Sequence, residues 1–503
     1  MIRTLLVTVM LFLVSCHDGA AQSDGLLRVG MAQMPISLDP RYATDASSMH
    51  IQQFLHRGLV RLDEHFNVQG DVALRWEHPS PLLWHFWLRP GIHFHDGSTL
   101  TSADVVTTLR AILNEKLASP LKGGFAAVER VDAQGKDQVE LILNKPDASL
   151  LTRLNVGILP KSLAMKPQHA RATIGCGPYR LLHWQSNELD LERVNPDALP
   201  HAVNHIRFVE VKDPVTRMLK IARGELDFIQ NDLPPYLLPY LRKQEAIHIQ
   251  TRPSTTFSYI GLNLHDRFLQ DVRVRQALAL ALDRGQLKRA LFADLPDLAE
   301  TVLAPDHWAA ASLPSGRFDP ERAIELLDQA GFPADAEGVR FSLTYRTSTD
   351  PTRIRLATAI ASMWEKIGIR VSIESLEWGG FYARIKSGDF QVFSLSWVGI
   401  TDPDIYRWIL HSSMWPPYGA NRGRYANKQV DDWLDRASAS QEQLERQRLY
   451  GLVQHQMYHD MVYIPLWYEP VIAVSGPRIH GFKPQADGSL FGLSQASFEA
   501  GRQ

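Results

Sequence analysis

The chain has 503 residues, a formal net charge of −2 and 45% hydrophobic residues, which is enough apolar material for several packed lobes. The balanced charge offers no basic patch, so we expect no nucleic-acid partner. After the first residues, no apolar run approaches the roughly twenty residues that a membrane-spanning helix needs.

The N-terminal segment, residues 1–15, predicts a signal peptide. Its apolar run, Leu5 to Val14, is too short to span a bilayer and is typical of the central part of such a peptide. The tetrapeptide Leu13-Val14-Ser15-Cys16 resembles a bacterial lipobox, in which the chain is cut before a lipidated cysteine. We therefore expect Cys16 to carry a lipid that anchors a periplasmic protein to a bacterial membrane. An ordinary signal peptide is the alternative. Cys176, the other cysteine, is then expected to be packed and inert.

Strands and helices are expected to alternate along the rest of the chain. Apolar runs predict strands at residues 26–31, 83–88, 139–143, 206–211 and 369–373. Apolar stripes at helical spacing, with capping residues, predict helices at about residues 51–59, 213–224, 271–285, 319–331 and 356–368, and another from residue 102. In the helix that Asp271 caps, Gly285 is the expected residue after the end. Alternation of this kind indicates an α/β architecture.

One stretch, Trp76 to Leu109, carries a specific motif. It reads WEHPSPLLWHFWLRPGIHFHDGSTLTSADVVTTL, an aromatic strand followed by a turn at His95-Asp96-Gly97 and a helix. It resembles the signature of the family 5 extracellular solute-binding proteins, the oligopeptide, dipeptide and nickel receptors of bacterial ABC importers. A second similar segment runs from Tyr259 to Arg284, and the resemblance extends over about residues 26–492.

The resemblance implies an α/β, two-lobed periplasmic-binding-protein fold of class II, of the large peptide-receptor type, with an extra subdomain in lobe one. Residues 16–25 would form a lipid-anchored linker after the signal peptide. Lobe I would comprise residues 26–70, 166–255 and 471–503, with the extra subdomain at 71–165 and lobe II at 256–470. The sequence contains no P-loop, Gly-x-Ser-x-Gly or His-Glu-x-x-His motif. We expect no enzymatic activity, cofactor or metal site.

The region from Phe393 to Tyr425 bears on the ligand. In peptide-binding members of the family, a strand after a tryptophan lies along the peptide, and an aspartate three residues beyond binds its α-ammonium group. If Trp397 is that tryptophan, Ile400 stands in the place of the aspartate. Three accounts remain open. In the first, Asp402 has moved into the clamp. In the second, Asp402 and Asp404 are only turn and helix-cap residues, and the ligand's amine is absent or unanchored. In the third, the ligand is a metal chelate or another small solute.

Two arginines of the following loop, Arg422 and Arg424, are suited to fork onto a carboxylate, with solvated surface charge as the alternative. Aromatic residues nearby form either ligand-stacking walls or core. The candidate ligand-binding residues are Met34, Trp378, Trp397, Val398, Asp402, Tyr418, Asn421, Arg422 and Arg424.

The resemblance therefore implies a monomeric substrate-binding lipoprotein that captures peptides or peptide-like solutes. Its partners would be the ligand, the membrane through the lipid anchor, and an ABC permease and ATPase complex that receives the ligand. The alternatives are a receptor for a non-peptide solute or metal chelate, or a ligand sensor that signals to a membrane partner.

Overall fold

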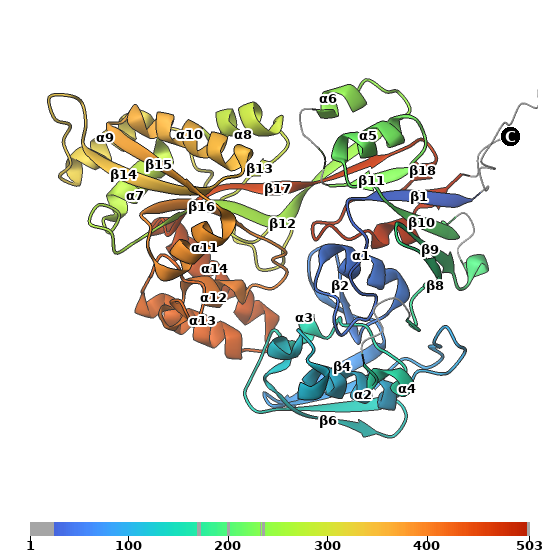
Figure 1. Ribbon diagram of the computed structural model, residues 1–503. Helices are drawn as coiled ribbons and strands as arrows, with labels where there is room; N and C mark the ends of the chain where they lie inside the picture. Colours follow the sequence, from blue (N-terminus) through green and yellow to red (C-terminus); the bar gives the residue numbers. More distant parts are fainter. Residues whose placement is uncertain (1–24, 168–172, 199–201, 232, 234–236, 500–503) are drawn as a thin grey trace, which may run out of the picture.

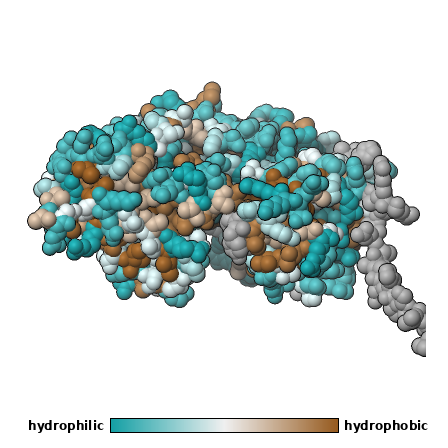
Figure 2. All heavy atoms as spheres, turned by 90° about the horizontal axis from the view of Figure 1, so that it is seen from above, coloured by the Kyte–Doolittle hydropathy of each residue, from teal (hydrophilic) through white to brown (hydrophobic). Residues whose placement is uncertain are grey.

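Two lobes share one long sheet in the computed structural model, which describes residues 25–167, 173–198, 202–231, 233 and 237–499. The lobes are joined by two long neighbouring antiparallel strands, β12 (His248–Leu262) and β17 (Tyr463–Ser475) (Figure 1). Figure 2 shows the same two masses from above, with a recess between them. The two-lobed α/β fold that the sequence predicts is confirmed.

Lobe I continues the sheet on one side of this pair. From β17 outward its strands are β11 (Phe228–Gln230), β1 (Leu26–Met31), β10 (His205–Glu210), β9 (Glu188–Arg193) and β8 (Tyr179–Trp184). Strand β1 pairs in parallel with both its neighbours, which is why it is almost entirely apolar. Its helices include α1 (Ala46–Leu55), α5 (Pro214–Ala222) and α6 (Leu238–Leu241). A shared core of α1, β1, β10 and the C-terminal segment holds the lobe together.

A separate four-stranded antiparallel sheet lies below lobe I in Figure 1. Its order is β4 (Ala73–Ser80), β5 (Leu83–Leu88), β7 (Gln138–Leu143) and β6 (Val128–Gln134). Alternate residues of β5 are buried, so Trp84 and Phe86 point into the core under α2 (Ser102–Leu113). Thr101 and Asp104 form a capping box that starts α2. The motif that carries the family resemblance therefore builds this subdomain.

Lobe II extends the sheet in the other direction from β12. Its further strands are β16 (Val392–Trp397), β14 (Phe341–Ser348) and β15 (Ile369–Leu376), all parallel to one another. One layer of helices comprises α7 (Val272–Leu280), α8 (Arg284–Phe292), α9 (Pro320–Gln329) and α10 (Pro351–Glu365). The other comprises α11 (Trp378–Ser387), α12 (Ile405–Leu410), α13 (Lys428–Ala439) and α14 (Gln443–His459). Two apolar clusters pack these layers against the strands.

The predicted strands and most predicted helices are confirmed, with two corrections. The helix predicted at about residues 51–59 is α1, which begins at Ala46 and ends at Leu55, before Leu59. The helix from Asp271 ends at Leu280, not before Gly285. Asp283 accepts a hydrogen bond from the backbone N–H of Gln286 and so caps a new helix, α8, which places Gly285 in its first turn. The sequence prediction took the glycine as a terminator and overlooked the aspartate two residues earlier as a helix start.

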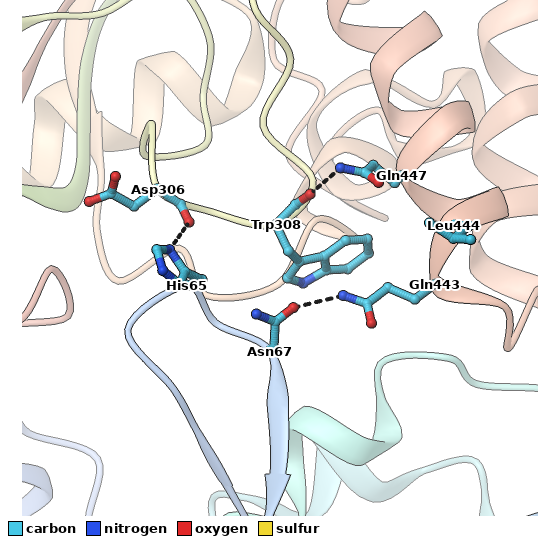
Figure 3. Close-up of a pocket in the computed structure, with 7 residues that line it drawn as sticks. All are labelled: His65, Asn67, Asp306, Trp308, Gln443, Leu444 and Gln447. Carbon is cyan, nitrogen blue, oxygen red and sulfur yellow. Dashed lines mark hydrogen bonds between the residues drawn. The ribbon is translucent and has the colours of Figure 1, made fainter.

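A seam of contacts joins the lobe I side to lobe II. The tip of the hairpin β2 (Val60–Leu62) and β3 (Val68–Gly70) meets residues 306–308, where Phe66 stacks on His307 with ring centroids 5.3 Å apart. Next to this contact, Asn67 accepts a hydrogen bond from Gln443 at 2.8 Å, and both residues line an open pocket of about 440 Å³ together with Trp308 (Figure 3). Further along the seam, the Ser149 hydroxyl lies within hydrogen-bonding distance of the carboxylates of Asp402 and Asp404. The inter-lobe contact is therefore polar and extended.

His307 makes the stability of this seam depend on pH. Burial lowers the pKa of His307 from 6.5 to about 4. Its Nδ1 accepts the N–H of Ala309, so a second proton there would break that bond. The folded protein thus takes up this proton at lower pH than the unfolded chain, and the associated stability, complete above pH 6.5, is lost as the pH falls toward 4.

We expect the free energy of unfolding to fall by about 3 kcal/mol more in the wild type than in a His307→Gln variant between pH 6.5 and 4. His56, whose pKa burial also lowers to about 4, adds to the slope in both proteins. The measurement is urea unfolding at several pH values, with His459→Gln on the exposed end of α14 as the control. Parallel profiles for the wild type and His307→Gln would contradict this assignment.

Candidate functional site

An arginine surrounded by aromatic rings lies where β16 ends. The guanidinium carbon of Arg422 is 4.4 Å from the ring centroid of Trp397, the last residue of β16. Arg422 Nη1 donates to the Tyr259 hydroxyl at 3.0 Å, and Nη2 donates to the Tyr382 hydroxyl at 3.2 Å. The Trp397 ring in turn stacks on Tyr259, nearly parallel at 5°. We call these four residues the Arg422 cluster.

Trp378 extends this cluster toward solvent. It is the first residue of α11, and its ring stacks on Tyr382 at 5.6 Å, four residues further along the helix. Its side chain is 55% exposed, whereas Phe381 beside it is buried in the lobe II core. The structure therefore brings together three of the predicted residues, Trp378, Trp397 and Arg422.

The charge of Arg422 has no carboxylate partner within the described residues. The residue is 8% exposed, and its hydrogen-bonding neighbours are phenols. Burial raises the pKa of Tyr259 to about 12, so this hydroxyl is neutral at physiological pH and does not offset the positive charge. A buried cation that faces only neutral groups leaves much of its desolvation cost uncompensated. The cluster is thus electrostatically prepared for an anion.

Arg424, two residues later, lies elsewhere. Its backbone has φ of +59°, and its side chain is exposed. Its guanidinium lies beside Gly388, the residue after the C-terminal end of α11. Trp378 begins that ten-residue helix, about 15 Å away along its axis. The structure does not bring the two arginines together on one side of the cluster.

Asn421 uses its amide to shape its own loop. Its Nδ2 donates to the carbonyl oxygens of Leu410, His411 and Tyr425, and its Oδ1 accepts the N–H of Tyr425. The residue is also buried. Its hydrogen-bonding groups are therefore used within the protein, where they hold the loop in place.

Three other predicted residues are partly or wholly exposed. Val398, directly after Trp397, is 77% exposed, and Tyr418 is 78% exposed. In lobe I, Met34 is partly buried, and its backbone N–H donates to Glu210 at 3.3 Å. The side chains of Val398 and Tyr418 offer exposed contact surface, and none of the three residues joins the Arg422 cluster.

Asp402 belongs to the seam between the lobes. One carboxylate oxygen lies 2.9 Å from the Ser149 hydroxyl, and the other accepts the Thr152 hydroxyl at 3.0 Å. It also accepts the backbone N–H of Asp404 at 2.9 Å, as expected for a turn residue. Ile400, at the position of the family's amine-binding aspartate, is buried. Protein donors therefore occupy both oxygens of Asp402.

The sequence prediction missed two members of the cluster, Tyr259 and Tyr382. Tyr259 was noted only as part of a strand motif, and Tyr382 was not singled out. Its position four residues after Trp378 on a helix was the available signal, because such residues share a face.

The remaining sequence candidates concern chemistry and anchoring. Cys176 is buried, and burial raises the pKa of its thiol to about 12, which makes it unreactive. Cys16 lies outside the described residues. Across the described ranges, no three His, Cys, Asp or Glu side chains gather as a metal site, and no helix is long and apolar enough to cross a bilayer.

Comparisons with known proteins agree with this architecture. The sequence profile of the "Bacterial extracellular solute-binding proteins, family 5 Middle" matches residues 67–415. Oligopeptide-binding protein AppA of Bacillus subtilis (strain 168) is 23% identical over 535 aligned residues, with 98% of each chain covered. Glutathione-binding protein GsiB of Escherichia coli (strain K12) is 26% identical over 477 aligned residues, with 89% of each covered.

Among solved structures, HbpA2 from Haemophilus parasuis has the same fold. It superposes with a TM-score of 0.85 at 22% sequence identity, over 94% of this chain and 100% of that one. The profile match covers well over half of the chain and includes the signature segment, β12 and the end of β16. The chain belongs to the bacterial extracellular solute-binding proteins of family 5.

Proposed function

We propose that this protein is the substrate-binding component of an ABC importer for peptides or peptide-like solutes. The solute is captured between the two lobes and passed to a membrane permease, whose ATPase supplies the energy. The observation that carries the proposal is the Arg422 cluster, a buried cation among aromatic rings at the end of β16 in lobe II. Family membership and relatives named for binding oligopeptides and glutathione support it.

Capture requires the lobes to move, and the connecting strands contain a site suited to bending. Pro253 of β12 stands opposite Pro470 of β17, and neither has an N–H to donate to the ladder. The pairing register then shifts between Pro253 and Phe257. The ladder between the lobes is therefore weakest at this point, and we propose that closure bends the pair there.

The proposal includes the location of the protein. It is a periplasmic monomer held to the membrane by a lipid on Cys16, after removal of residues 1–15. It performs no catalysis and needs no cofactor, since its role is to bind and release.

A non-peptide solute or a metal chelate is the second candidate. Ile400 replaces the amine-binding aspartate of the family pattern, and Asp402 is held by Ser149 and Thr152. A ligand without an α-ammonium group would explain both observations. A sensor would bind its ligand in the same way but would signal to a membrane partner and would not deliver the ligand to a permease.

Native mass spectrometry of the chain from Ser23 onward, purified without denaturation, tests the proposal. We expect the folded protein to carry a series of masses that resolve, on denaturing release, into short peptides. If the protein arrives empty, incubation with a random tetrapeptide pool should produce the same series. A single non-peptide mass would establish the second candidate, and failure to retain anything from the pool would contradict peptide binding.

A further inference from the structure

The four-stranded subdomain contacts lobe II through α3 (Leu150–Arg153). This short helix follows β7 in the chain, and its first residue packs into the subdomain core. The Ser149 hydroxyl, directly before the helix, lies 2.9 Å from a carboxylate oxygen of Asp402 and 2.6 Å from one of Asp404. The Thr152 hydroxyl donates to the other oxygen of Asp402 at 3.0 Å. The subdomain is therefore bonded directly to two acids of lobe II.

Two backbone hydrogen bonds also cross from the lobe I side to lobe II. Next to Ser149, the N–H of Ala148 donates to the carbonyl oxygen of Ser438 in α13 at 3.3 Å. At the hairpin of β2 and β3, the N–H of Trp308 donates to the carbonyl oxygen of His65 at 3.1 Å. Neither bond can survive separation of the lobes, because its donor and acceptor lie on opposite sides of the seam. These two N–H groups therefore report whether the lobes are closed.

The contacts between these two places form a continuous row. Close to the connecting strands, Arg252 of β12 donates to Asp306 at 2.8 Å and lies 3.7 Å from the Glu64 carboxylate of the hairpin. The Nδ1 of His307 is occupied as an acceptor, so its Nε2 carries the hydrogen and donates to the Thr401 carbonyl oxygen at 3.3 Å. Thr401 directly precedes the acid that Ser149 and α3 contact. The row thus runs from the connecting strands down to α3 (Figure 1).

The row is polar and open to water, so it can separate and form again. Apart from the stacking of Phe66 on His307, its contacts are hydrogen bonds and ion pairs. The bond between Asn67 and Gln443 is exposed, and an open pocket lies beside it (Figure 3). Water can replace the partner of each such group when the lobes part, which keeps the cost of opening moderate. The row therefore has the character of a reversible contact between domains.

We propose that Ser149 and Thr152 latch the subdomain onto Asp402 and Asp404, and that this latch holds the lobes closed in a receptor that carries no solute. Asp402 then serves lobe closure and not the ligand's amine, which agrees with the buried Ile400 at the position of the family's amine-binding aspartate. A solute enters only when the latch opens, so the latch limits the rate of capture. The inference goes beyond the proposed function because it requires no particular solute.

Amide hydrogen exchange of the empty protein, followed by mass spectrometry, tests the latch. Any bound solute is first removed by unfolding in urea and refolding, and native mass spectrometry checks that the protein is empty. We expect the wild type to slow exchange at the N–H groups of Ala148 and Trp308 at least a hundredfold relative to an unstructured chain. The double variant Ser149→Ala, Thr152→Val should lose at least tenfold of this protection at both positions.

The substitutions are chosen to leave the fold intact. Ser149 makes no side-chain hydrogen bond that caps α3, and valine has nearly the shape of threonine. Exchange in the buried strand β7 should therefore stay unchanged. The matched control is Ser98→Ala, Thr107→Val, which removes the same two kinds of hydroxyl from the same subdomain. Their bonds, to Asp96 and to the carbonyl oxygen of Ala103, are local, so this control should keep the wild-type protection.

A second variant approaches the latch from lobe II. Asp402→Asn removes the charge that accepts the Thr152 hydroxyl and should lower the protection of both reporter amides, as the double variant does. Small-angle X-ray scattering should give a larger radius of gyration for these variants than for the empty wild type, because open lobes extend the molecule.

Three results would overturn the latch. Free exchange of both amides in the wild type would mean that the empty receptor is open. Loss of protection at Ala148 alone, with Trp308 unchanged, would indicate a local effect at α3. Variants that exchange like the wild type would show that these hydroxyls do not hold the lobes. Since no solute takes part, each of these results leaves the import proposal standing, and failure to retain peptides would leave the latch standing.

Discussion

Gly175→Ala is expected to destabilise the protein by about 3 kcal/mol or more. A Cβ atom at this position would lie 1.8 Å from the carbonyl oxygen of Leu55 and 2.7 Å from its carbonyl carbon. Both are backbone atoms at the end of α1, so they cannot move aside without shifting the helix. Gly175 also exchanges a backbone bond with His95, whose N–H donates to its carbonyl at 2.8 Å. The substitution would thus disturb the junction between lobe I and the four-stranded subdomain.

Urea unfolding monitored by circular dichroism measures this effect. Gly451→Ala is the matched control because a Cβ there meets nothing within 4 Å and Gly451 is inside α14. Alanine is the better helix former, and this control should gain up to about 1 kcal/mol. Equal midpoints for Gly175→Ala and the wild type would show that the junction can open at little cost.

Arg446→Met is expected to cost about 2–4 kcal/mol of stability, somewhat less than a fully buried pair because the acidic partners are partly exposed. Arg446 Nη2 lies 3.6 Å from Asp402 and 3.9 Å from Asp404. These two acids also share a single Ser149 hydroxyl, whose one hydrogen can serve only one of them at a time. Without the arginine, these two carboxylates, which lie together on the lobe II side of the seam, would have lost the cation beside them.

A series of variants that remove the acidic charges tests whether charge repulsion causes the loss of stability in Arg446→Met. Asp402→Asn and Asp404→Asn, introduced together into Arg446→Met, should restore much of the lost stability because the repulsion disappears. Arg436→Met, at an exposed position of α13, is the control and should change stability by less than about 0.5 kcal/mol. If the triple variant were no more stable than Arg446→Met, lost packing against Trp308, and not charge, would be responsible.

Local signals in the sequence predicted most of the fold. Apolar alternation in 83–88 and the capping residues around 101–104 are interactions between near neighbours in the chain, and they predicted β5 and the start of α2. The prediction of one helix over 271–285 was wrong because two helices follow each other almost without a loop. Asp283 is typical of a helix start and Gly285 is typical of a helix end, so the sequence alone supported both interpretations.

The candidate site was less accessible to sequence reasoning. Arg422 and Arg424 are the same residue type in one loop, yet the structure buries Arg422 and exposes Arg424. Tyr259 reaches Arg422 from a strand 163 residues earlier in the chain, a contact that no local pattern encodes. The pairing of Asp402 with Ser149 is of the same kind, since it spans 253 residues and two lobes. Side-chain directions and contacts between distant parts of the chain are therefore what sequence reasoning could not predict about this site.

The position of β17 in the sheet has a consequence for the order in which the molecule can form. Strands β1 and β11 are complete by residue 230, yet the outer neighbour of β11 is β17, which follows all of lobe II in the chain. A chain that emerges N-terminus first therefore leaves the edge of β11 unpaired until residue 475 is available. Lobe I is therefore the first lobe to be synthesised and the last to be completed. A nascent chain halted before residue 463 leaves the edges of β11 and β12 unpaired, and such edges can pair with other chains.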